Sequence, residues 1–243
     1  MRARWAFPAL VLWACGGSEK KETVPSEPEG QPEHGRGPQV DEEEDPQDIE
    51  VQGLLGRLEP SQIQPVIEMR WRSIEECYRD NSGKNRFIGG HMELKFRVNR
   101  DGTVKQVWVM DGDLGAWPVE KCVLEVCKGM TFPKPKGGEA EFQFPVDFPA
   151  RQSSVSLAES GSDAELQPKW PALEECKEDG FEVPRVRISV YVGPGGVVKS
   201  AGFVTPDGPL DQAWADCVHQ KALSWKLTDP RGKVVKATSW YQP

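Results

Sequence analysis

Two stretches of the chain alternate between apolar and polar residues, and each leads through a glycine-containing turn into a second strand-like stretch. Residues 91–99 (HMELKFRVN) and 186–192 (VRISVYV) are the first members of these pairs. The turns NRDG and GPGG connect them to residues 103–110 and 197–204. Alternation with period two, interrupted by turn residues, is typical of β-hairpins. The apolar face of the first hairpin strand is expected to hold Met92, Leu94, Phe96 and Val98.

Helical periodicity surrounds both hairpins. After each hairpin comes a helix-like segment, at 118–130 or 210–225, and then a closing strand, at 139–148 or 233–241. The motif EEC precedes both hairpins, in EECYRDN and EECKEDG. The chain therefore contains the same helix–strand–strand–helix–strand unit twice. Before the first hairpin an apolar stripe recurs at spacings of four, three and four, typical of an amphipathic helix, and consists of Ile67, Trp71, Ile74 and Tyr78.

The two helices of each unit can cover one face of a three-stranded antiparallel sheet. The sequence therefore predicts an α+β fold with two tandem two-layer α-β-β-α-β domains. The first is expected at residues 61–149 and the second at 168–243, where the first helix is shortened after Pro171. Residues 150–167 are expected to be the linker between them.

Residues 1–15 resemble the signal peptide of a bacterial lipoprotein. Two arginines precede an apolar run that is too short to cross a bilayer as a helix. The following LWAC resembles a lipobox, which implies cleavage before Cys15 and lipid modification of its sulfur. No acidic retention signal follows this cysteine, so the resemblance implies an outer-membrane anchor facing the periplasm. The alternative is an ordinary signal peptide cut elsewhere.

Residues 16–60 have the composition of a disordered tether. They are rich in Glu, Pro, Gly and Gln, nearly lack aromatic residues, and carry thirteen acidic and four basic side chains. Such a segment buries too little apolar surface to offset its ordering entropy. Because the whole chain has a net charge of −8, the remainder is close to neutral. No basic patch with interleaved aromatic residues supports nucleic-acid binding.

Four cysteines occupy equivalent places in the two units. Cys77 and Cys122 lie on the two predicted helices of the first unit, and Cys176 and Cys217 correspond to them in the second. In an oxidising periplasm each pair is expected to form a disulfide between helices. A disulfide that closes a loop of this size stabilises the fold by about 4 kcal/mol on the chain-entropy model.

The remaining cysteine of the first unit, Cys127, aligns with Ala222 of the second. A small buried thiol is the expected role, and a reactive or intermolecular cysteine is the alternative.

Neither a metal site nor an active site is expected. A metal site from the paired cysteines with His91 or His219 is the alternative to the disulfides, but C-x2-C and H-x3-H spacings are missing. The third histidine, His34, lies in the tether. No motif of a nucleophile, a metalloprotease, a phosphate loop or paired catalytic carboxylates occurs. We therefore expect a protein that is not an enzyme, with no catalytic residues, cofactor or small-molecule substrate.

The first unit is similar to the AgmX/PglI C-terminal domain family, which itself resembles the C-terminal domain of TonB. The similarity spans residues 63–148, and residues 168–243 form a degenerate copy in which Leu227-Thr228 replaces the FP after the second helix. The family is associated with the cell envelope and with gliding motility, through protein contacts instead of chemistry. The landmarks at family-like spacing are Cys77, Gly90, Gly102, Cys122, Phe132-Pro133, Gly137-Gly138 and the closing FP strand.

The resemblance implies a protein-binding module of an envelope assembly, concerned with motility or transport. In TonB-like folds an extended peptide adds to an exposed sheet edge, here the strand from Glu139 to Phe148 with Phe142 and Phe144, or its counterpart in the second unit. Two alternatives are a structural scaffold that contacts the envelope or cell wall, and a TonB-like accessory of energy transduction.

Two tryptophans of the first unit, Trp108 and Trp117, are candidate surface anchors for the partner. A role for each in the core is the alternative.

Overall fold

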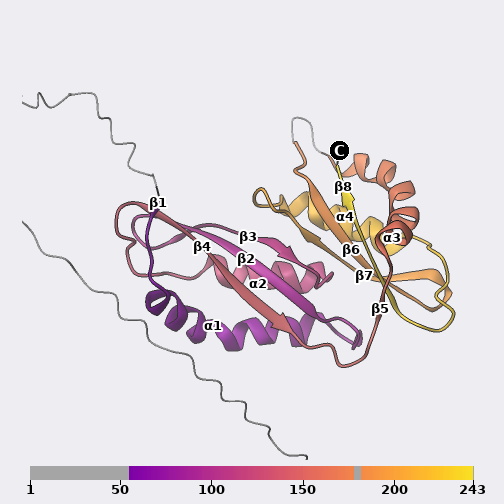
Figure 1. The fold of residues 1–243 in the computed structure, drawn as a ribbon, viewed down its shortest axis with the longest axis horizontal. Helices are drawn as coiled ribbons and strands as arrows, with labels where there is room; N and C mark the ends of the chain where they lie inside the picture. The colour runs from indigo at the N-terminus through magenta and orange to yellow at the C-terminus, as the bar shows by residue number, and fades with distance from the viewer. Residues whose placement is uncertain (1–54, 178–181, 243) are drawn as a thin grey trace, which may run out of the picture. The chain divides into compact units, whose positions relative to one another are not determined.

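The computed structural model describes residues 55–177 and 182–242, which form a mixed α+β fold with two four-stranded sheets (Figure 1). Cys15 and the tether up to residue 54 lie outside the described residues, so the lipid anchor stays a prediction. No helix of the described part is long and apolar enough to cross a membrane.

The first unit contains one sheet with the strand order β1-β4-β2-β3. Strands β2, β3 and β4 are antiparallel neighbours, and the short β1 pairs parallel to the start of β4. Helices α1 and α2 cover one face of the sheet, as the amphipathic stripes predict. The elements are β1 (Leu55–Gly56), α1 (Pro60–Asn81), β2 (Gly90–Val98), β3 (Val104–Gly112), α2 (Trp117–Lys128) and β4 (Glu139–Phe148).

The second unit repeats this arrangement, with the strand order β5-β8-β6-β7 and a short parallel β5 beside β8. In place of a long first helix it has α3 followed by a 3-10 helix, η1 (Figure 1). The elements are β5 (Val155–Ser156), α3 (Glu159–Leu166), η1 (Gln167–Cys176), β6 (Val186–Gly193), the 3-10 turn η2 (Pro194–Gly196), β7 (Val197–Val204), α4 (Gln212–Ser224) and β8 (Val235–Tyr241).

The predicted apolar face of β2 forms the centre of the first core. Its four apolar side chains are at most 1% exposed. Helix α1 begins with Pro60 and a capping box between Glu59 and Gln62, and it buries Ile67 and Ile74 against this core. The last turn of α1 is fixed by Tyr78, whose hydroxyl donates to the Ile88 carbonyl (2.8 Å).

Part of the range expected to be a linker, 150–167, is instead folded. Strand β5 pairs with β8, and α3 packs along β8 with Leu166 fully buried. The Ser239 hydroxyl donates to the Asp163 carboxylate across this contact (2.5 Å). The sequence hides this helix because its few apolar residues make no stripe. The end of the expected tether is also folded, since β1 and the buried Leu58 belong to the first unit.

Disulfides join Cys77 to Cys122 and Cys176 to Cys217, the pairs expected from the sequence. The first links α1 to α2, and the second links η1 to α4. Cys127 is a free thiol only 1% exposed, and burial raises its pKa to about 12. Because the thiolate is the reactive form, this cysteine is a packing residue.

The two units contact each other through the face of the second sheet that its own helices leave free. The Tyr191 hydroxyl of β6 donates to the Gly89 carbonyl (3.0 Å), and the Ser200 hydroxyl of β7 donates to the Gly115 carbonyl (2.9 Å). The Thr205 amide donates to the Val109 carbonyl of β3 (2.9 Å). Strand β6 is therefore buried on both faces, which explains why its sequence is more continuously apolar than that of β2.

Candidate strand-addition edge

The outer edge of β4 is open over most of its length. Strand β1 pairs only with Glu139 and Ala140, and no strand of the described residues pairs with the outer side of Glu141 to Phe148. Pro145 lies within this stretch and has no N–H to donate, which confines it to an edge strand with its nitrogen directed outward. Because side chains and main-chain groups alternate, Gln143 is expected to direct its N–H and C=O to the same open side.

The corresponding edge of the second unit is covered. Strand β5 pairs with Val235 and Lys236 at the start of β8, the Leu157 amide donates to the Lys236 carbonyl (2.8 Å), and α3 packs along the strand. The two units therefore differ at this edge, which is open in the first unit and covered in the second.

Half-buried aromatic side chains lie beside the open edge. Phe142 and Phe144 project from β4 towards the helical face and pack against the core, where the rings of Phe96 and Phe142 stack with their centroids 4.8 Å apart. Trp71 of α1 belongs to the same half-buried group. This face offers apolar contacts to every second side chain of an added strand.

A pocket of about 400 Å³ lies between α1 and the end of β4. The ring of Tyr78 stacks on Phe148 at 4.8 Å, and its hydroxyl proton is shared between the carbonyls of Ile88 (2.8 Å) and Pro149 (3.0 Å), which holds the strand end against the helix. Burial raises the pKa of Tyr78, and the charge of Arg151 acts in the opposite direction. The lining residues are Trp71, Glu75, Tyr78, Arg79 and the segment from Asp147 to Arg151.

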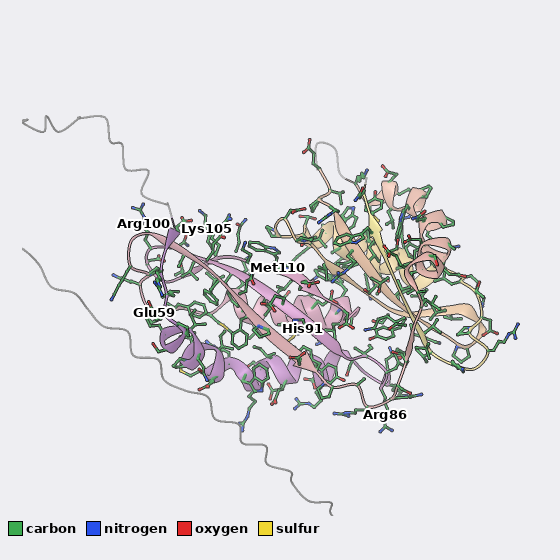
Figure 2. The ribbon with its side chains drawn as sticks, in the orientation of Figure 1. Glu59, Arg86, His91, Arg100, Lys105 and Met110 are labelled. Carbon is green, nitrogen blue, oxygen red and sulfur yellow. A yellow bond between two sulfur atoms is a disulfide. The ribbon has the colours of Figure 1, made fainter. Side chains whose placement is uncertain are left out.

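The last residues of β4 are tied to β2 by His91 (Figure 2). Its Nδ1 lies 3.0 Å from Oδ1 of Asp147, and its Nε2 lies 3.2 Å from Oε2 of Glu93. Partial burial lowers the pKa of His91, but the hydrogen bonds and charges of the two carboxylates outweigh burial and raise it above its ordinary value of 6.5. Protonated His91 therefore stabilises the end of the candidate edge.

This contact predicts a pH-dependent stability. The stabilisation by His91 is expected to be complete below its unfolded pKa and to disappear as pH rises through the raised folded pKa. The free energy of unfolding of wild type should exceed that of His91→Gln by less than about 1 kcal/mol at pH 5, because the contact is partly exposed. At pH 9 the two free energies should be equal. Unfolding in urea at both pH values measures this. A pH-independent difference would contradict it.

The structure places the residues expected to bind a partner in different environments. Glu139 lies in the part of β4 that β1 covers, and its carboxylate accepts a hydrogen bond from the Lys105 ammonium (2.9 Å). Phe142 and Phe144 lie beside the open edge.

The two candidate tryptophan anchors are buried. Trp108 and Trp117 are 4% and 3% exposed. The Trp117 indole donates to the Asp216 carboxylate of the second unit (2.7 Å), so it contributes to the contact between units. Neither ring is a surface anchor: Trp117 packs in the second core, and Trp108 is buried on the face of the first sheet that its helices leave free.

Sequence reasoning did not single out the pocket residues Trp71 and Arg151 as site residues. Trp71 was assigned only to the apolar stripe of α1, and its half-exposed position shows that it lies at the margin of that stripe. Arg151 follows the end of β4 with no pattern around it.

The sequence matches no family model, and no curated protein or solved structure matches it. Among the described residues, no cluster of three His, Cys, Asp or Glu side chains is arranged to hold a metal ion.

Proposed function

We propose that this chain is a non-catalytic protein-binding module in which an extended peptide of a cell-envelope partner adds as a strand to the outer edge of β4. The observation that carries the proposal is that the edge from Glu141 to Phe148 is open, whereas the edge of the equivalent strand β8 is covered. Proteins usually protect such edges, and an open one is a template for main-chain hydrogen bonds.

The surroundings of the edge define the chemistry of the peptide. Its side chains on the helical side would meet Phe142, Phe144 and the pocket next to Trp71, so apolar residues at alternate positions suit this site. Its side chains on the opposite side would meet the exposed Gln143 and Asp147, which favours polar residues there.

The setting of the module follows from the sequence resemblances. The proposal includes a pair of TonB-like domains of the AgmX/PglI type, tethered through Cys15 to the periplasmic face of the outer membrane in a motility or transport assembly. The repeated order of elements supports the tandem arrangement. The two disulfides suit an oxidising compartment.

A proline at position 143 tests strand addition. Gln143→Pro would remove an outward N–H without disturbing the ladder to β2, because position 143 has the same orientation as Pro145. Extended peptides selected from a random library against the mature chain should bind at least tenfold more weakly to this variant, since several main-chain hydrogen bonds of about 1 kcal/mol each would be lost or distorted.

The matched control is Gln143→Thr, which keeps the N–H and should bind like wild type. Equal thermal unfolding of the three proteins would show that the fold is intact. Selected peptides that bind Gln143→Pro with unchanged affinity, or that shift the amide resonances of β3 instead of β4, would refute the proposal. Sedimentation with purified cell wall tests the scaffold alternative independently.

A further inference from the structure

One buried carboxylate, that of Glu120, joins the two units. Glu120 belongs to the first turns of α2 and is 2% exposed. Its Oε1 accepts the Ala116 amide at the start of α2 (2.9 Å), and its Oε2 accepts the Phe203 amide of β7 (2.8 Å). A single side chain of the first unit therefore satisfies a main-chain donor on the edge strand of the second.

The side of this carboxylate that faces Gly202 is closely packed. A Cβ added to Gly202 would lie 2.1 Å from Oε1 of Glu120 and 2.4 Å from the Ala116 nitrogen. Such close packing leaves no room for a water molecule on this side.

The charged groups of the elements packed around Glu120 are engaged elsewhere. Among the described residues, no cation forms an ion pair with Glu120. On α4, burial lowers the pKa of His219, and the charge of Asp216 acts in the opposite direction. On β7, the Lys199 side chain lies towards Gly193. The ion pairs are Lys121–Asp216, Arg187–Asp111 and Lys236–Asp113.

An ionised carboxylate in this position is costly in free energy because only main-chain dipoles stabilise it. Burial raises the pKa of Glu120 from 4.5 to about 7, although hydrogen bonds from Phe203, Ala116 and Gly115 lower it in part. Separation of the units would uncover the start of α2, which Gly202 of β7 packs against, and would return the Glu120 side chain to water, where its ordinary pKa applies.

We propose that Glu120 is a proton-dependent latch, through which the two units hold each other more tightly when its carboxyl is protonated than when it is ionised. The docked state binds a proton that the separated state releases. The docking equilibrium should therefore weaken about tenfold for each pH unit between the two pKa values, about 300-fold in total, and should be constant outside that window.

Opening of the latch would free the Phe203 amide on the edge of β7 and the Tyr191 face of β6. The edge of β4 lies in the first unit and does not take part. The latch is therefore independent of the proposed peptide site, and either can fail without the other.

Hydrogen exchange of the full chain, followed by NMR between pH 5 and pH 8.5, tests the latch. After correction for the intrinsic exchange rate, protection of the Phe203 amide should fall at least thirtyfold over this range. Amides of β2, the central strand of the first unit, should keep their protection because that unit stays folded. A pH-independent protection at Phe203 would overturn the proposal.

Two variants separate the latch from other titrating groups. Glu120→Gln keeps the size of the side chain without its charge and should remove the pH dependence at Phe203. Glu125→Gln, on the exposed side of the same helix, should retain it. If Glu120→Gln does not fold, a carboxyl-carbon titration of wild type decides, since a midpoint near 4.5 would also overturn the proposal.

Discussion

Gly202→Ala is expected to separate the two units without unfolding either of them. The added Cβ would lie 2.4 Å from the Ala116 nitrogen and 2.6 Å from the Gly115 carbonyl carbon, in addition to its clash with Glu120. Two of these contacts are with main-chain atoms, which cannot rotate away as a flexible side chain does. Overpacking of this kind costs about 3 kcal/mol or more, and here the whole cost falls on the contact between the units.

Small-angle X-ray scattering of the variant should show a larger maximum dimension than wild type, and Phe203 should lose its protection at every pH. Gly208→Ala is the matched control, because nothing lies within 4 Å of the Cβ that it would introduce. Scattering of Gly202→Ala that is identical to wild type would mean that the units pack differently from the arrangement described above.

The equivalent position in the first unit is occupied by Trp108. When the two hairpins are aligned, this tryptophan corresponds to Gly202. Its ring lies on the polar face of the first sheet, with the Lys95 ammonium 5.7 Å from the ring centre. The two sheets therefore use equivalent faces differently. The face of the second sheet docks closely on the first unit at Gly202. The Trp108 ring would keep a partner from approaching the equivalent face of the first sheet as closely.

Removal of the Cys77–Cys122 disulfide should be the most destabilising change within the first unit. The bond closes a loop of 45 residues between α1 and α2, and its loss should lower the free energy of unfolding by about 4 kcal/mol. The candidate edge would weaken as well, because α1 holds the end of β4 through Tyr78. Urea unfolding of Cys77→Ala/Cys122→Ala, followed by circular dichroism, measures the loss.

Cys127→Ala serves as the control for this variant, because it removes one small buried sulfur without a cross-link. It should cost about 1 kcal/mol. A double variant that is no less stable than this control would show that packing alone holds the two helices together.

The sequence alone determined the local elements and their repetition. The period-two pattern identified β2 and its buried face, since Met92, Leu94 and Phe96 alternate with polar residues that stay near the surface. The equivalent positions of the cysteines identified which pairs could meet. These features depend on residues close in the chain or on repeated spacing, which a single sequence displays directly. The choice of β4, with Phe142 and Phe144, as the candidate edge came instead from the resemblance to TonB-like domains.

Only the tertiary structure decided which surfaces are covered. Tryptophan is a common anchor residue at protein interfaces, but Trp108 and Trp117 are buried by neighbours that are distant in the chain. The same holds for the edge of β8, which α3 covers from a segment that looks like a linker. Glu120 carries no signal in its own helix, because its role depends on a glycine and an amide of the other unit. A strand or helix pattern shows whether a face is apolar or polar. Whether that face is covered depends on packing between elements that are far apart in the chain.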